Sequence, residues 1–249
     1  MPIGSATRAV NKLIPKRGAN KLIEVLDDIP IILSLEEVLG RLQVSRQNKY
    51  IENSVRELVE RVKPLAGARA IYKVSYVNNK DGDSLEIGGV KFTSRVLRVN
   101  LDRIERVFPY IITCGKEISE IAISQNDLIK SYYLDTIKDI LLDSALTYLK
   151  DYLGEKHQTA QMSSIAPGSL EDWPITQQKE LFSLFNKRET AIGVRLTENY
   201  VMEPAKSISG ILFPTEIRFE SCQLCPRERC FGRRAPYDPD LAKIYRQPT

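Results

Sequence analysis

The spacing of apolar residues changes twice along this chain of 249 residues, and these changes limit the folds that it can adopt. Apolar side chains within residues 35–62 recur every three or four positions, as in amphipathic helices, and the capping box Ser34-Leu-Glu-Glu37 precedes them. Residues 70–77 are rich in β-branched and aromatic types and are followed by turn residues, as in a strand of a hairpin. The helical spacing returns in residues 127–153. Because the strands do not alternate regularly with helices, this order indicates an α+β fold rather than a doubly wound one.

We expect the chain to have three parts. Residues 1–65 are predicted to form an N-terminal helical segment, and residues 66–213 an α+β core in which helices flank a twisted, mainly antiparallel sheet. Residues 214–249 are poor in apolar side chains and contain three of the four cysteines. We therefore expect this last part to be an irregular, cysteine-rich tail that packs on the same domain. The lack of an internal repeat argues against a solenoid.

Charge and hydropathy exclude several classes of protein. The net charge is +4, from 36 basic and 32 acidic residues, which is too small to indicate binding to nucleic acid. No stretch approaches the roughly 20 apolar residues that a membrane helix needs, and no apolar leader precedes a cleavage site. We expect a soluble, cytoplasmic protein that binds neither nucleic acid nor membrane. The basic residues between Arg8 and Lys21 are predicted to form a solvated or partly disordered arm.

The motifs of several common enzyme classes are missing from the sequence. It has no G-x-x-x-x-G-K-[ST] loop for nucleotide phosphates and no G-x-G-x-x-G dinucleotide turn. Its single histidine, His157, excludes a zinc site with two histidine ligands and has no nucleophile-elbow motif to serve. These observations argue against most hydrolases and kinases.

The most informative stretch is Leu196-Thr-Glu-Asn-Tyr-Val-Met-Glu-Pro-Ala-Lys-Ser-Ile-Ser-Gly210, with Ala166-Pro-Gly168 upstream. It resembles the activation domain of cobalamin-dependent methionine synthase, in which the matching pattern is Leu-Thr-Glu, then Met-x-Pro, then Ser-x-Ser-Gly. The order and spacing agree over residues 160–213, and residues 68–155 fit more loosely. The resemblance predicts an activation-domain-like fold.

The resemblance also implies a function. In that family the domain binds S-adenosylmethionine and acts on a neighbouring corrinoid, so that cobalt oxidised to the inactive cob(II) state is reduced by a separate donor and methylated again. The chain has no Asp-x-His-x-x-Gly loop of the kind that places a histidine beneath cobalt in many corrinoid carriers. The corrinoid is therefore expected on a partner, either a corrinoid-binding protein or a methionine synthase core. The resemblance associates the chain with a methyltransferase and does not by itself make it an enzyme.

The family loop that binds the ligand reads Arg-x-x-x-Gly-Tyr. Here its glycine matches Gly168, whereas Ser164 stands at the arginine position and Ser169 at the tyrosine position. The predicted ligand site is therefore different in charge, and Arg195, Arg188 or Lys206 are candidates to replace the missing arginine. The residues that the resemblance assigns to the ligand are Ser164, Ala166, Pro167, Gly168 and Ser169, with Glu198 and Asp143 as acidic groups for its amino group and sulfonium.

A structural interpretation of the same residues is also open. Gly168 can serve only to permit a turn after Pro167. Thr197, Glu198, Ser207 and Ser209 can be strand-end and turn residues that preserve the fold without touching a ligand.

The cysteines of the tail form a C-x2-C-x4-C cluster, Cys222, Cys225 and Cys230. Three thiolates within nine residues can converge on one metal. The fourth ligand has to come from elsewhere in the chain, with Cys114 as the first candidate and His157 as the second. Zinc and a 4Fe–4S cluster both suit four thiolates. We favour the cluster because it can relay an electron and because four nearby arginines would offset its charge. Free cysteines, a disulfide and a C-x-x-C redox pair are the alternatives.

Three hypotheses follow from the sequence. The first is the reductive reactivation of a corrinoid methyltransferase, with S-adenosylmethionine as the methyl donor. The second is a non-catalytic module that binds a corrinoid protein, or delivers an electron to it, without using S-adenosylmethionine. The third is a zinc-stabilised protein with an unrelated partner.

Overall fold

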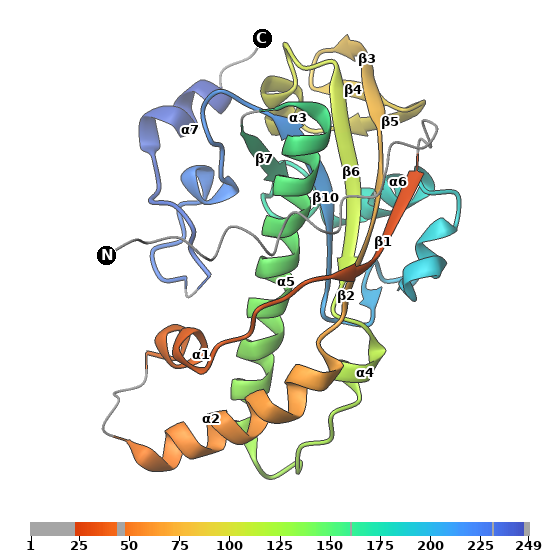
Figure 1. Cartoon of the computed structure of the whole chain (residues 1–249). Coiled ribbons are helices and arrows are strands. Elements are labelled where there is room, and N and C mark those ends of the chain that lie inside the picture. The colour runs from red at the N-terminus through yellow and green to blue at the C-terminus, as the bar shows by residue number, and fades with distance from the viewer. Residues whose placement is uncertain (1–22, 44–47, 160, 231, 247–249) are drawn as a thin grey trace, which may run out of the picture.

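The computed structural model describes residues 23–43, 48–159, 161–230 and 232–246 (Figure 1). The predicted basic arm between Arg8 and Lys21 lies outside these residues, as do all of residues 1–22 of the predicted helical segment. Among the residues that are described, no helix is long and apolar enough to cross a membrane.

An eight-stranded sheet lies at the centre of the molecule, and all of its strand pairs are antiparallel. Strands β1, β2, β6, β3, β4 and β5 follow one another in that order, while β10 joins β6 on its other side and β7 joins β10. The strands are β1 (Ile23–Ile29), β2 (Ala68–Lys73), β3 (Ser75–Asp81), β4 (Ser84–Ile87), β5 (Val90–Thr93), β6 (Arg106–Thr113), β7 (Met162–Ile165) and β10 (Ser207–Pro214). A separate small hairpin consists of β8 (Arg195–Leu196) and β9 (Met202–Glu203).

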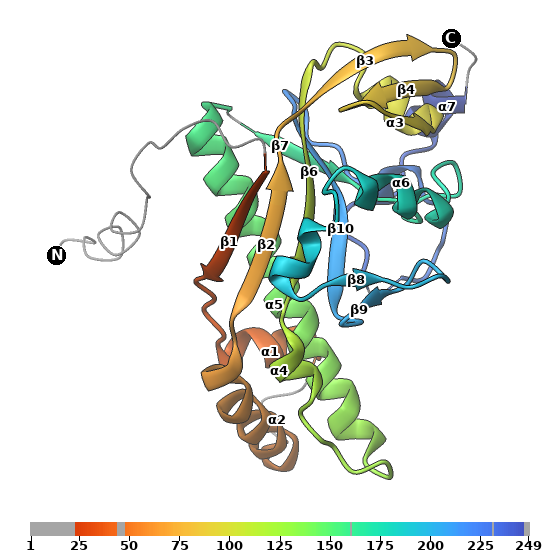
Figure 2. The same cartoon turned by 90° about the vertical axis from the view of Figure 1, so that its right-hand side faces the viewer.

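Helices cover both faces of this sheet, in agreement with the predicted α+β fold. The long helix α5 runs along one face, with α1 and α2 packed against it, and α3, α6 and α7 lie toward the other (Figures 1 and 2). The helices are α1 (Leu35–Arg41), α2 (Lys49–Val62), α3 (Arg95–Asn100), α4 (Lys116–Ser119), α5 (Leu128–His157), α6 (Gln178–Ser183) and α7 (Pro239–Arg246), with 3-10 turns η3 (Lys63–Leu65), η4 (Ile175–Gln177), η5 (Arg188–Ile192) and η6 (Ser221–Leu224).

Alternation along the strands creates two apolar cores, one on each face. Neighbouring residues of one strand point to opposite sides, so Phe108 and Ile112 of β6 face α5, whereas Val107 and Ile111 face the other core. Both faces of β6 are covered, which is why the whole strand from Val107 to Thr113 is buried.

The structure corrects the helical prediction for residues 23–29. This segment is β1, an edge strand that pairs with β2 in the register Val25↔Ile71 (Figure 2). Its sequence Ile-Glu-Val-Leu-Asp-Asp-Ile carries β-branched residues at Ile23 and Val25, and these favour a strand over a helix. The helices predicted at Leu35 and Val55 are confirmed, and Ser34 caps α1 by accepting a hydrogen bond from the amide of Glu37 at 3.1 Å.

The long helix ends later than its sequence suggests. We predict Gly154 as its stop, but α5 continues to His157 and ends where Gln158 adopts a left-handed conformation, with φ of 55°. The carbonyl of Gly154 then accepts a hydrogen bond from the amide of Thr159 at 2.9 Å. A Cβ on residue 154 would lie 3.2 Å from the carbonyl oxygen of Thr159. Gly154 thus gives the returning chain room instead of ending the helix.

A polar cluster ties the edge strand β1 to α5. The hydroxyl of Tyr72 donates to Glu24 at 2.8 Å, and the ammonium of Lys156 donates to the same carboxylate at 2.5 Å. Lys156 also donates to the hydroxyls of Tyr72 and Tyr152, at 2.9 Å and 3.2 Å. Burial by itself would raise the pKa of Glu24, but the hydrogen bonds from Lys156 and Tyr72 outweigh it and lower that pKa.

This cluster predicts how the stability of the protein changes in acid. A carboxyl group whose pKa is lower in the folded chain stabilises the fold above its unfolded pKa, about 4.3, and loses that effect as the pH falls through the folded value. We expect Glu24→Gln to make the free energy of unfolding less sensitive to pH below about pH 5, as measured by urea denaturation. Glu171→Gln removes an exposed carboxylate and serves as the control. Equal pH profiles for wild type and Glu24→Gln would contradict the assignment.

A second prediction concerns Gly210 of β10. Tyr110 of β6 is its partner in the sheet, and a Cβ on residue 210 would lie 2.6 Å from the carbonyl oxygen of Ile165 and 3.0 Å from the Tyr110 hydroxyl. We expect Gly210→Ala to lower the free energy of unfolding by roughly 1–3 kcal/mol, because backbone and a buried ring must move. Gly40→Ala, in open space on α1, should be neutral or slightly stabilising. Chemical denaturation of both variants tests this, and a Gly210→Ala variant as stable as wild type would refute it.

Candidate functional site

The predicted ligand loop follows β7 and forms a tight turn. The amide of Ser169 donates to the carbonyl of Ala166 at 3.1 Å, and the Ser169 hydroxyl donates to the same oxygen at 2.7 Å. The amide of Gly168 donates to the carbonyl of Trp173 at 2.7 Å. Gly168 has φ of +79°, and a Cβ there would lie 3.0 Å from Cδ1 of Ile175. The turn therefore requires glycine, while Gly168 itself remains exposed to solvent.

Ser164, at the arginine position of the family loop, bonds to another hydroxyl. Its Oγ lies 2.9 Å from the Tyr110 hydroxyl, which reaches it across Gly210. Burial raises the pKa of Tyr110 to about 12, so this hydroxyl is neutral at physiological pH. The motif glycine at 210 thus makes room for a buried tyrosine that holds β7 in place.

The C-terminal segment, residues 215–246, lies alongside β7 and the loop (Figure 1). The amide of Phe219 donates to the Ser163 hydroxyl at 2.8 Å, and the hydroxyls of Ser169 and Ser221 lie 3.3 Å apart. Phe219 and Leu224 are buried in the apolar core on the side of the sheet that faces away from α5. β7 pairs only with β10 in the sheet, and the C-terminal segment contacts it through the Ser163 hydroxyl.

Asp143, a predicted ligand residue on α5, is held by two arginines. Arg234 of the C-terminal segment donates to its carboxylate at 2.6 Å, and Arg41 of α1 donates to its other oxygen. Asp143 therefore joins α1, α5 and the C-terminal segment. Each of its oxygens accepts from one guanidinium, so two arginines already balance its charge.

Glu198 lies in the turn between β8 and β9. This hairpin is on the α6 side of the sheet, away from β7 (Figure 2), and the Glu198 side chain is exposed. Within the described residues, no hydrogen bond or ion pair links it to the loop. Thr197 shapes the turn, because its amide donates to the carbonyl of Val201 at 2.8 Å and its hydroxyl accepts from the Val201 amide at 3.1 Å. The contacts of Thr197 match the structural interpretation.

The three residues proposed to replace the missing arginine have other partners or lie elsewhere. Arg195 pairs with Glu203 across the β8–β9 hairpin. Lys206 pairs with Asp139 of α5 at 2.8 Å. Arg188 is exposed on η5. None of them has a described contact with the loop.

The four cysteines do not gather in the structure. Cys114 is buried in the apolar core between the sheet and α5. Its thiol donates to the carbonyl of Lys138 at 3.6 Å, and burial raises the pKa of this thiol to about 12. Cys222 and Cys225 are half-buried and Cys230 is exposed. Among the residues described, no three His, Cys, Asp or Glu side chains are placed to share a metal ion.

The guanidinium of Arg233 lies within the loop that carries Cys222, Cys225 and Cys230. Arg233 donates to the carbonyl oxygens of Cys222 at 3.2 Å, Ala235 at 3.3 Å and Cys225 at 3.4 Å, and also to that of Arg227. Arg233 thus binds the backbone of the loop that carries the cysteines. Within the described residues, Cys222, Cys225 and Cys230 do not converge with Cys114 or His157, so the iron–sulfur or zinc site stays a prediction that the structure does not support.

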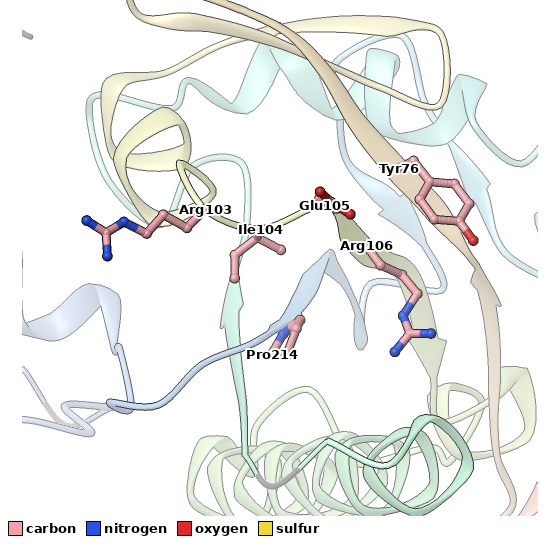
Figure 3. Close-up of a pocket in the computed structure, with 6 residues that line it drawn as sticks. All are labelled: Tyr76, Arg103, Ile104, Glu105, Arg106 and Pro214. Atoms are coloured by element: carbon pink, nitrogen blue, oxygen red, sulfur yellow. The ribbon is translucent and has the colours of Figure 1, made fainter.

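A shallow hollow of about 410 Å³ lies at the junction of β3 and β6 (Figure 3). Arg103 and Arg106 lie on opposite sides of it, and Tyr76, Ile104, Glu105 and Pro214 complete the lining. Arg106 donates to the carbonyl of His157 at 3.3 Å. None of the residues predicted from sequence lines this hollow, and its residues follow no motif that could have indicated it.

Comparison with known proteins supports the resemblance. The family model described as the activation domain of vitamin B12 dependent methionine synthase matches residues 145–221, from the second half of α5 into the C-terminal segment. A crystal structure of the MetH reactivation domain bound to AdoHcy has a TM-score of 0.51 and 14% sequence identity, and the match covers 80% of this chain and 81% of that chain. No curated protein matches the sequence. These findings confirm the predicted resemblance and the predicted fold.

The placement of the cysteines predicts their reactivity. In the folded protein we expect Ellman's reagent to modify Cys230 first, then Cys222 and Cys225, and Cys114 only after denaturation, because that thiol is buried and protonated. Cys114→Ala should remove the one thiol that appears on unfolding. Protection of all four thiols until a chelator is added would instead show a shared metal site.

Proposed function

We propose that this protein reactivates a corrinoid-dependent methyltransferase in the cytoplasm, by binding S-adenosylmethionine and presenting its methyl group to cobalt on a partner. The observation that carries the proposal is the family match over residues 145–221, which includes the loop and the Ser207–Gly210 motif. The likeness in fold to a reactivation domain bound to AdoHcy supports it. The partner is a corrinoid-binding protein or a methionine synthase core.

The proposed reaction has two steps. A separate donor protein supplies one electron that reduces cob(II) to cob(I). The electron pair of cob(I) then forms a cobalt–carbon bond with the methyl group while the carbon–sulfur bond breaks, and S-adenosylhomocysteine leaves with that bonding pair. Cobalt is thereby oxidised by two electrons to the methylated cob(III) state. No metal site within this chain is needed for either step.

The contribution of the protein is to hold the ligand in position and keep water away. The exposed Gly168 turn, which has no side chain at its apex, lets a ligand approach the backbone closely. When the protein holds the sulfonium in line with cobalt, methyl transfer becomes an effectively intramolecular step, which lowers its entropic barrier. Exclusion of water protects the reactive reduced cobalt from side reactions.

A second candidate is a module that binds a corrinoid protein without S-adenosylmethionine. It is favoured by the state of the two serines that replace the family's arginine and tyrosine, since Ser164 bonds to Tyr110 and Ser169 to Ala166. Electron delivery through a cluster in this chain loses its support, because the cysteines do not converge.

Calorimetric titration separates the two candidates. We expect wild-type protein to bind S-adenosylmethionine and S-adenosylhomocysteine, and Gly168→Ala to weaken both by about tenfold, because the new methyl group meets Ile175 and displaces the turn. Gly193→Ala is the matched control. Its φ of +74° imposes a similar backbone penalty, of about 1 kcal/mol, with open space around the new atom.

A functional assay completes the test. The full chain, a corrinoid partner in the cob(II) state and a reductant should yield methylcobalamin only when S-adenosylmethionine is present. Failure of the wild-type chain to bind either ligand would refute the proposal and leave the binding module.

A further inference from the structure

Two cysteines of the C-terminal segment lie on one tight turn, and the proposed reaction gives them no role. The amide of Cys225 donates to the carbonyl of Cys222 at 3.3 Å, at the end of the 3-10 turn η6. A hydrogen bond between residues three apart brings their Cα atoms within about 7 Å of each other. A disulfide needs Cα atoms about 4.4–6.8 Å apart. The backbone of the turn thus holds this pair close enough for a cross-link.

Arg233 fixes the turn from one side. Its guanidinium donates to the carbonyl of Cys222 at 3.2 Å and to that of Cys225 at 3.4 Å, so one rigid, planar group holds both residues of the pair. The carbonyl of Gln223, which lies between them in the chain, accepts from the amide of Asp238 at 2.9 Å. The turn is therefore already ordered while both thiols are free, and little chain entropy is left to lose when the two sulfurs join.

The surroundings of the pair suit thiol chemistry. Cys222 and Cys225 are half-buried, and the sulfur of Cys222 accepts a hydrogen bond from the amide of Arg234 at 3.4 Å. Reactive cysteines lie in electropositive, partly exposed places. Arg233, which pairs with no carboxylate among the residues described, supplies that positive charge here. Cys114, by contrast, is buried in the core.

The third cysteine of the segment is placed differently. The carbonyl of Cys230 accepts from the amide of Arg233 at 3.3 Å, which puts Cys230 on a separate turn, and its side chain is exposed. In the part of the chain that the structure describes, no hydrogen bond joins Cys230 directly to Cys222 or Cys225. The geometry therefore singles out Cys222 with Cys225 and leaves Cys230 as a free thiol.

We propose that Cys222 and Cys225 form a reversible disulfide and so make the C-terminal segment a site of thiol–disulfide exchange. One thiolate of the pair attacks oxidised glutathione, forms a mixed disulfide and releases the first glutathione. The second cysteine then attacks the protein sulfur of that mixed disulfide, forms the Cys222–Cys225 bond and releases the other glutathione. The pair loses two protons and two electrons, and the glutathione disulfide takes up both.

The position of the pair gives this chemistry a place near the candidate ligand site. Ser221 belongs to the same turn, and its hydroxyl lies 3.3 Å from that of Ser169 in the ligand loop. A cross-link at Cys222 and Cys225 thus stiffens the stretch that contacts the loop. Formation of the disulfide does not depend on the proposed function, because it needs neither S-adenosylmethionine nor a corrinoid.

Trypsin separates the pair from the third cysteine, which makes the test direct. It cuts after Arg218, Arg227 and Arg229, so Cys222 and Cys225 share the peptide 219–227 while Cys230 lies on another. The full chain is incubated with glutathione buffers of rising oxidised fraction, alkylated and digested. We expect peptide 219–227 to lose both alkylation sites and to become lighter than its dithiol form by two hydrogen atoms. Dithiothreitol should restore both sites.

Serine variants identify the two partners. We expect Cys225→Ser to lose the cross-link and to carry one glutathione on Cys222, because no second thiol completes the exchange. Cys222→Ser should lose the cross-link as well. Cys230→Ser is the matched control, and its glutathione ratio at half-oxidation should stay within about twofold of wild type. Urea denaturation of the reduced variants checks that each is folded.

Three outcomes would overturn the inference. The first is alkylation of Cys222 and Cys225 at every glutathione ratio in the wild-type chain. The second is a cross-link that joins peptide 219–227 to the peptide of Cys230. The third is protection of all three thiols that ends only when a chelator is added, since this would show a metal on the thiolates. The proposed function stands in the first two cases, because it uses no cysteine.

Discussion

The burial of β6 on both faces is the constraint on which the rest of the structure depends. This strand pairs with β2, β3 and β10, and its alternate side chains supply both apolar cores. Because neither face is left to solvent, each needs its own cover, and α5 provides one while α3 and α6 contribute to the other. The hydrogen bond between Tyr110 of β6 and Ser164 of β7 spans β10 and so connects β6 to the strand after which the ligand loop begins.

Much of the fold could be predicted from local patterns, and the exceptions have local causes. The start of α5 follows from Asp127, which caps it, and β10 follows from the apolar run before Phe213. The sequence did not predict β1, a short edge strand that pairs only with β2. The register of Val25 with Ile71 shows that this partner lies some 45 residues further along the chain. Pairing over such a distance leaves little trace in the local sequence. The end of α5 was placed too early because Gly154 is required by the chain that returns past the helix, a tertiary contact. The boundaries at residues 65 and 213 stay predictions.

The candidate site was less predictable than the fold, because its chemistry depends on contacts between distant segments. The turn at Gly168 could be recognised from its motif, but the pairing of Asp143 with Arg41 and Arg234 could not, since these residues are brought together only by folding. The cysteine spacing is compatible with a metal, yet spacing does not reveal that the neighbouring Arg233 fills the loop.

The guanidinium of Arg233 has a consequence for how the C-terminal segment holds its shape. A loop organised by an arginine keeps a permanent charge at its centre, because this group does not lose its proton in proteins. Its four carbonyl contacts involve no bond that oxygen can attack and no ion that has to be supplied by the cell. The contacts that Arg233 makes are therefore insensitive to redox conditions, whereas the free thiols of Cys222, Cys225 and Cys230 in the same segment remain open to oxidation.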